Sequence, residues 1–110
     1  MIELTIYNYL KSALGTPVYF EIPEDAPEQF VLLEKTGSSR TNRIDSATFA
    51  IQSYAETMYK AAQLNDRVKA AMDAMPYTEN VGRVALNSDY NYTDTTSKRY
   101  RYQAVYDLTY

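Results

Sequence analysis

The chain has 110 residues, of which 45% are hydrophobic and 23% charged, and its formal net charge is −3. These values are typical of one ordinary globular domain, and the negative charge gives no support to non-specific binding of polyanions. Because the chain has no Cys and no His, disulfides, thiolate metal sites, cysteine nucleophiles and histidine bases are excluded.

The first 35 residues predict one helix followed by two strands. Apolar residues recur at helical spacing from Ile6 to Leu14, and Gly15 and Pro17 then end the helix. A short strand, a polar loop and a largely apolar, central strand are predicted at 18–22 (VYFEI), 23–28 (PEDAPE) and 29–35 (QFVLLEK).

A hairpin and a second helix are predicted next. Loop residues 36–45 (TGSSRTNRID) join the preceding strand to a strand at 46–54 (SATFAIQSY), in which apolar and polar residues alternate. The two strands are expected to form an antiparallel hairpin with a long, basic tip. Ser53 and Glu56 have the spacing of a capping box, so the second helix is predicted to begin there and to end at Pro76.

The last part of the chain predicts a second hairpin, with strands at 83–92 and 98–110 around the polar residues 93–97. The order helix, strand, hairpin, helix, hairpin predicts an α+β fold. We expect a single domain over residues 1–110, in which a mostly antiparallel sheet of about five strands has two helices packed on one face.

Few residues have the spacing that catalysis or metal binding requires. The three glycines lie too far apart for a phosphate-binding loop. Glu24, Asp25 and Glu28 form an acidic cluster, which is either a paired-carboxylate hydrolase site or a solvated loop. Asp89 and Asp94 lie in DYNYTD, which lacks the glycine and the distal glutamate of a calcium loop. We therefore expect no enzyme activity, no cofactor and no metal site.

Basic residues and tyrosines are interleaved in residues 97–110 (SKRYRYQAVYDLTY), a mixture often found in nucleic-acid-binding proteins. In a strand, however, side chains alternate between faces, so the tyrosines fall on one face and Arg101 on the other. In the partner strand, Leu86, Tyr90 and Tyr92 are in phase with one another. The tyrosines and arginines are thus predicted to be segregated. The tyrosine face fits a core under the helices, a subunit interface or a nucleic-acid surface.

Charge is uneven along the chain. Residues 17–34 contain five acidic and no basic residues, whereas the predicted hairpins carry Arg40, Arg43, Lys98 and Arg99. This is either ordinary surface variation or a head-to-tail interface. In such an interface the acidic face of one subunit meets the basic hairpins of the next, and the contact closes into a ring.

Three phrases of the sequence carry a resemblance to a known family: PVYFEIPEDAPEQFVLLEKTG, SATFAIQSYAETMYKAAQLNDRVKAAM and YRYQAVYDLTY. A strand before a P-x-x-x-P loop and FVLL, a strand TFAIQSYA running into an amphipathic helix, and a last strand with aromatics resemble the tail terminator proteins of long-tailed bacteriophages. These are also called tail completion or tail-to-head joining proteins. The resemblance covers essentially the whole chain and consists of patterns of elements with few diagnostic residues.

The resemblance implies a virion structural protein that is located in the phage tail and assembled in the bacterial host cytoplasm. A hexameric ring of such subunits would sit on the finished tail tube, stop tube polymerisation and offer a surface to the head connector. The implied partners are further copies of the chain, the major tail tube protein and a head-completion protein. No membrane is involved, and DNA would only pass through the lumen of the ring.

The resemblance places subunit or tail-tube contacts in the loop of the first hairpin, at Arg40, Arg43 and Asp45. The charge distribution adds further candidate contact residues, namely Glu24, Asp25, Glu28, Lys98 and Arg99. Two alternatives stay open. One is a head-closure or minor capsid protein of the same gene cluster, and the other is a small nucleic-acid-binding module that uses the C-terminal tyrosines and arginines.

Overall fold

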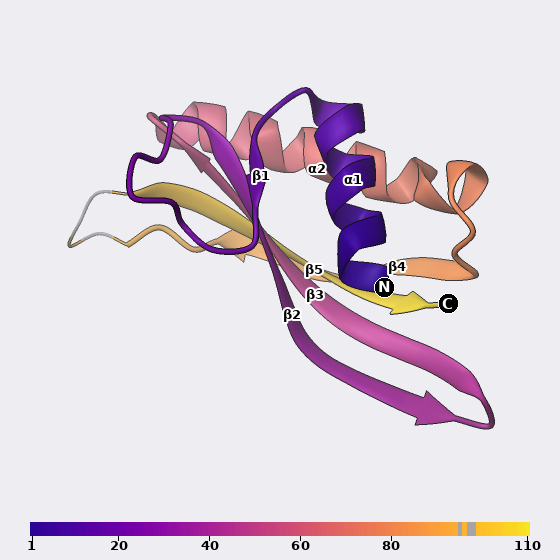
Figure 1. The fold of residues 1–110 in the computed structure, drawn as a ribbon. Helices are drawn as coiled ribbons and strands as arrows, with labels where there is room; N and C mark the ends of the chain where they lie inside the picture. Colours follow the sequence, from indigo (N-terminus) through magenta and orange to yellow (C-terminus); the bar gives the residue numbers. More distant parts are fainter. Residues whose placement is uncertain (95, 97–98) are drawn as a thin grey trace.

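A computed structural model describes residues 1–94, 96 and 99–110 of the chain (Figure 1). Within these residues it contains two helices, α1 (Ile2–Leu14) and α2 (Met58–Thr78), and one five-stranded sheet. The strands are β1 (Val18–Tyr19), β2 (Phe30–Thr41), β3 (Ile44–Ala55), β4 (Arg83–Asn91) and β5 (Tyr100–Thr109). They lie in the order β1-β2-β3-β5-β4, and every neighbouring pair except β1 and β2 is antiparallel. The predicted α+β class and mostly antiparallel sheet are confirmed.

Helix α1 buries the predicted apolar face. Its C-terminus is also as predicted: Gly15 has a φ of 63°, in the left-handed region, and its N–H bonds to the Lys11 carbonyl. The Leu14 carbonyl accepts a hydrogen bond from the guanidinium of Arg67, which ties the end of α1 to α2. The buried residues of α1 are Ile2, Ile6, Leu10 and Leu14.

Replacing Gly15 with alanine is expected to lower the free energy of unfolding by about 1–2 kcal/mol, because L-residues are strained in the left-handed region. A Cβ at Gly15 would meet nothing within 4 Å, so the cost is purely conformational. Urea unfolding of the variant measures it. Gly37→Ala is the matched control, since its Cβ would also be in open space and its φ is not positive. Equal losses in the two variants would contradict this account.

Strand β1 is shorter than the predicted strand 18–22. Only Val18 and Tyr19 pair, in parallel, with Val31 and Leu32 of β2. The chain then leaves the sheet, and the ring of Phe20 stacks on Tyr7 of α1 with 5.1 Å between centroids. Residues 23–28 form a connection, as predicted. By strand order, β3 rather than the predicted β2 is the central strand of the sheet.

The predicted loop 36–45 is wrong, because both strands continue through it. Arg40 pairs with Asp45 and Thr41 with Ile44, so only Asn42 and Arg43 form the turn. Both turn residues have positive φ, 52° and 66°, as in the type I′ turn that matches the twist of hairpin strands. We call residues 36–45 the arm. Its side chains from 36 to 44 are exposed, and Figure 1 shows it projecting beyond the rest of the sheet.

Helix α2 differs from the prediction at both ends. Its N-cap is Thr57, whose Oγ1 accepts a hydrogen bond of 3.1 Å from the Lys60 N–H, whereas Ser53 stays inside β3. The helix continues past Pro76 to Thr78, and the Glu79 N–H still bonds to the Met75 carbonyl. Its buried side includes Ala61, Leu64, Val68, Met72 and Met75, which recur at helical spacing.

The predicted C-terminal hairpin is confirmed, since β4 and β5 pair antiparallel. The predicted phase of β4 is wrong. The pairing shifts between Leu86 and Ser88, so one extra residue lies between them. Leu86 is therefore opposite Tyr106, whereas Tyr90 is opposite Gln103, on the other face of the sheet.

Both helices pack on the same face of the sheet (Figure 1) and share one apolar core with it. Tyr106 of β5 is completely buried there, as the core interpretation of the tyrosines requires, whereas Tyr110 is exposed. The described residues place no helix over the opposite face, which we call the open face. The sheet contributes to the core Val31, Leu33, Phe49, Ile51, Ala104, Tyr106 and Leu108. The open face includes Gln52, Tyr54, Arg101 and Gln103.

Candidate interaction surfaces

The predicted contact residues Arg40, Arg43 and Asp45 lie together at the end of the arm. Arg40 Nε is 3.5 Å from Asp45 Oδ1, across the two strands. This is a surface ion pair and contributes little stability. Arg43 is exposed at the turn and makes no ion pair with any residue that the structure describes. The arm therefore presents a guanidinium that is available to another molecule.

The predicted acidic residues Glu24, Asp25 and Glu28 lie at the opposite end of β2, in the connection from β1. Glu28 lines a hollow of about 240 Å³ whose other side is formed by Arg99. The structure thus brings the acidic connection close to the start of β5, at the connected end of the β4–β5 hairpin, within one chain. The sequence interpretation instead placed them on different subunits. Lys98, the other predicted basic residue there, lies outside the described residues.

An arginine–aromatic strip crosses the open face near this hollow. The rings of Phe30 and Tyr54 stack with centroids 4.5 Å apart, and the Arg99 guanidinium lies 5.3 Å from the Tyr54 centroid. Arg101 lies 5.6 Å from the Tyr54 ring and 4.4 Å from the Tyr92 ring. These distances are those of cation–π contacts. The predicted segregation of tyrosines from arginines holds within β5, where Tyr106 and Arg101 are on different faces. It is wrong for the sheet as a whole, because the extra residue in β4 turns Tyr92 to the arginine face.

A chain of hydrogen bonds fixes the side chains next to the strip. Arg101 Nη1 donates to the Tyr54 hydroxyl at 2.7 Å, and that hydroxyl donates to Gln52 Oε1 at 3.0 Å. Gln52 Nε2 donates to Gln103 Oε1 at 2.9 Å, and Gln103 Nε2 donates to the Tyr90 hydroxyl at 2.6 Å. Since Gln52 and Gln103 are buried, this network holds β3, β5 and β4 in one arrangement.

One carboxylate lies further along the open face, toward the arm. Asp107 accepts hydrogen bonds from the Thr48 hydroxyl at 2.7 Å and from the Asn87 amide at 3.1 Å. The hydrogen bond from Thr48 lowers the pKa of Asp107 most, and the bond from Asn87 lowers it further, because both stabilise the ionised form. The open face is therefore basic near the hollow, and toward the arm it carries the ionised Asp107 together with Arg83.

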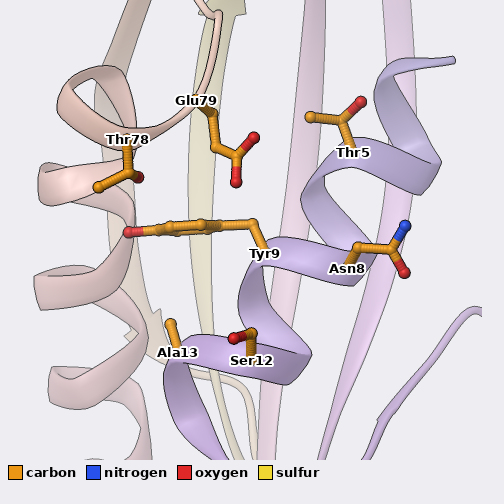
Figure 2. A pocket seen from close by; sticks show the side chains of 7 residues that line it. All are labelled: Thr5, Asn8, Tyr9, Ser12, Ala13, Thr78 and Glu79. Atoms are coloured by element: carbon orange, nitrogen blue, oxygen red, sulfur yellow. The ribbon is translucent and has the colours of Figure 1, made fainter.

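The largest hollow that we describe is a groove of about 640 Å³ between α1 and the end of α2 (Figure 2). Figure 2 shows the Tyr9 ring crossing from α1 toward α2, where its hydroxyl donates to the Ala71 carbonyl at 2.5 Å. Glu79 is the only carboxylate in the lining, and no lining residue pairs a nucleophile with a base. The groove thus offers hydrogen-bonding groups. Its lining consists of Thr5, Asn8, Tyr9, Ser12, Ala13, Thr78 and Glu79.

The described residues contain no group of three or more His, Cys, Asp or Glu side chains placed to hold a metal ion. None of their helices is both long and apolar enough to cross a membrane. The candidate surfaces are therefore the arm, the hollow with its strip, and the groove.

No known family model matches this chain, and no curated protein matches it. A functional proposal must therefore be supported by the residues of the chain itself. The arm carries three of the predicted contact residues and projects from the fold, so it is the surface on which we base the proposal.

Proposed function

We propose that the chain is a structural protein of a long-tailed phage or prophage virion, a tail terminator rather than an enzyme. It assembles as a ring on the tail tube, stops tube polymerisation and joins the tail to the head connector. The resemblance in the order of elements supports this proposal, and the observation that carries it is the arm.

The arm is a two-stranded ribbon without a further strand beside it among the described residues. β1 reaches only Val31 and Leu32, and β5 pairs with β3 only from Ser46 onward. An isolated two-stranded hairpin is marginally stable in water. The Tyr110 N–H bonds to the Asp45 carbonyl at 3.0 Å, and beyond this point both faces of the ribbon are exposed and both edges are unpaired. Such a ribbon gains stability when another molecule covers it. A neighbouring subunit and the end of a tube are molecules of that kind.

Arg43 adds a second argument for contact at the arm. A non-glycine residue with a φ of 66° costs about 1–2 kcal/mol, and glycine is the favoured residue at this place in a type I′ turn. The chain therefore has a long, charged side chain at a position where the backbone conformation favours glycine. Such strained positions are concentrated at functional sites.

The arm and the acidic connection lie at opposite ends of the molecule, which suits a ring with two different rims. β2 has 12 residues and spans about 40 Å, and the whole molecule is 44 Å long. The arm ends in the unpaired Arg43, and the other end of β2 follows Glu24, Asp25 and Glu28. In a ring of level subunits the arms lie on one rim and the acidic connections on the other, and two rims of unlike charge suit a ring that joins two different partners.

Tube assembly tests the proposal directly. The chain is mixed with the major tail tube protein encoded beside it, and tube length is followed by electron microscopy. We expect capped tubes that stop growing, with a ring of this chain at one end. Tubes that grow at an unchanged rate with none of the chain bound would refute it. Binding to the head connector alone would instead favour the head-closure alternative.

Substitutions at Arg43 separate contact from folding. Arg43→Gly is expected to raise the free energy of unfolding by about 1 kcal/mol, since the turn strain is released, and yet to weaken ring formation and tube capping. Arg43→Ala keeps the strain and removes the charge, so it should lose capping without gaining stability. Arg43→Lys is the control that keeps the charge. Full capping by the alanine and glycine variants would show that Arg43 makes no contact.

One observation favours a second candidate function, binding of single-stranded nucleic acid. The strip places Arg99 and Arg101 beside the rings of Tyr54 and Tyr92, which is the combination used for base stacking and phosphate contact. The Arg101 guanidinium, however, already contacts both rings and donates a hydrogen bond to the Tyr54 hydroxyl. A titration with single-stranded DNA or RNA at low and high salt tests it. A flat titration at low salt would exclude this function.

A further inference from the structure

The sheet has two unpaired edges of equal length. On one side, β1 pairs only with Val31 and Leu32, so residues 33–41 of β2 have a free outer edge. On the other side, β4 (Arg83–Asn91) is the last strand, and no described residue pairs with its outer edge. Each free segment contains nine residues. Neither β4 nor residues 33–41 contain proline, and β4 contains no lysine, so β4 lacks two common protections of edge strands.

We propose that residues 33–41 of one copy pair antiparallel with β4 of the next copy, so that neighbouring subunits form one continuous sheet. This inference rests on the proposed ring and names the strands that join its subunits. β2 and β4 lie on opposite sides of the sheet and run in opposite directions. Two copies in the same orientation therefore bring β2 antiparallel to β4, as adjacent strands in this fold mostly are.

The interruptions of the two strands, together with the place that β1 occupies, select one register. In β2 the pairing shifts between Lys35 and Gly37, and in β4 it shifts between Leu86 and Ser88. Each shift changes which residues face the helices, because an extra residue breaks the alternation. A register that keeps every pair on a common face must place these two shifts opposite each other.

That condition is met when Lys35 lies opposite Asp89 of the next copy. Ser38 then lies opposite Leu86, and all three of Lys35, Ser38 and Arg40 meet partners that also face the helices. The ladders show which residues face the helices. In β2, Lys35, Ser38 and Arg40 are opposite Phe49, Ala47 and Asp45 of β3. In β4, Val84, Leu86 and Asp89 are opposite the buried residues Leu108, Tyr106 and Ala104 of β5. Shifting by two residues toward the end of the arm places Gly37 opposite Asp89, on different faces. Shifting by two residues the other way keeps the faces matched, but it places Asn91 opposite Val31, whose outer edge is already paired with β1. Lys35 and Asp89 already form ion pairs within their own chain, with Glu3 at 3.1 Å and with Lys69 at 3.2 Å, so this register brings the two pairs together as a cluster of alternating charge.

The register requires only a small offset between copies. Through the ladders of one sheet, Val31 is level with Ser53, Tyr102 and finally Asn91. In the proposed contact Asn91 lies opposite Leu33 of the next copy, an offset of two residues or about 7 Å along the strands. Neighbouring copies are therefore nearly level, as a flat ring requires, and the contact covers Leu86, which is 45% exposed in the free chain.

Cysteine cross-linking tests this contact, because the chain has no cysteine of its own. The variant carrying both Ser38→Cys and Leu86→Cys should give a ladder of disulfide-linked oligomers on mild oxidation. The largest band gives the number of copies in the ring. A bond within one chain is excluded, since these positions are three strand spacings apart, about 14 Å, and a disulfide needs Cα atoms within about 7 Å.

The matched control carries Ser39→Cys with Leu86→Cys, a pair that points to opposite faces and should give monomer only. A mixture of the two single variants Ser38→Cys and Leu86→Cys should give dimers and no longer species. Equal ladders from test and control pairs, or no Ser38–Leu86 bond up to the solubility limit and on capped tubes, would overturn the inference.

A second variant checks the edge without cysteines. Leu86→Lys places a charge on the outer strand and should abolish oligomers, whereas Tyr77→Lys, at an 89% exposed position of α2, should not. Circular dichroism of both variants checks that each is folded. Oligomers retained by folded Leu86→Lys would count against the pairing. If the chain caps tubes but no Ser38–Leu86 disulfide forms, this contact is rejected and the tail function is retained. If the disulfide forms but the chain does not cap tubes, the tail function is rejected and the contact is retained.

Discussion

Replacing Phe49 with alanine is expected to lower the free energy of unfolding by about 3–5 kcal/mol. Phe49 has no exposed surface and lies in the middle of β3, the central strand of the sheet. Its neighbours in the ladders are Lys35 of β2 and Tyr106 of β5, and its ring belongs to the core shared by both helices. The lost contacts and the cavity left behind add to each other, because the surrounding strands cannot collapse freely.

Urea unfolding followed by circular dichroism measures this loss. Tyr77→Ala is the control, because Tyr77 is 89% exposed and its removal should change the free energy of unfolding by less than about 0.5 kcal/mol. If Phe49→Ala loses less than about 1 kcal/mol, the core does not lie where the structure places it.

The burial of Phe49 was predictable, and so was most of the core. In residues 46–54 the apolar residues alternate with polar ones, and Ala47, Phe49 and Ile51 are all buried. The apolar face of α2 was predictable for the same reason, since residues from Ala61 to Met75 recur at helical spacing. The spacing of apolar residues along the sequence indicates which side of a helix or strand is buried, and these two patterns are of that kind.

The arm was not predictable in this way. Its residues are exposed on both faces, so no apolar alternation marks it as a strand. Gly37, the serines and Asn42 are typical of loops, and local chemistry alone favours a loop there. What keeps the arm in strand form is the continuing backbone ladder and the turn at Asn42 and Arg43. The predicted contact residues were nevertheless placed at its end, since they surround that turn.

The arginine–aromatic strip could not be predicted from the sequence, for two reasons. The extra residue between Leu86 and Ser88 reverses the facing of Tyr90 and Tyr92, and Asn87 carries no distinctive signal for it. The strand order also places the β1–β2 connection beside Arg99, although they are about seventy residues apart in the chain. Contacts of this kind follow from topology, which local pattern constrains only weakly.

Replacing Tyr106 with phenylalanine is expected to stabilise the protein, by about 1–2 kcal/mol at neutral pH. The Tyr106 side chain is completely buried, and its hydroxyl has no hydrogen-bond partner among the described residues. An unpaired buried hydroxyl has lost its bonds to water without replacement, so its removal recovers that cost. The phenylalanine ring keeps the packing with Phe49 and Leu108. A destabilised variant would mean that the hydroxyl does have a partner, such as a buried water molecule.

The same residue predicts how stability depends on alkaline pH. Burial, and then the charges of Asp73 and Asp89, raise the pKa of Tyr106 well above its ordinary value. Above pH of about 10 the unfolded state loses this proton while the folded state keeps it. Unfolding is then favoured as pH rises, by up to about 1.4 kcal/mol per pH unit. Tyr106→Phe removes this contribution, so its advantage over the natural chain should grow between pH values of about 9 and 11. Urea unfolding at a series of pH values measures the difference, and parallel curves for the two proteins would show that Tyr106 ionises as easily in the folded state as in the unfolded state.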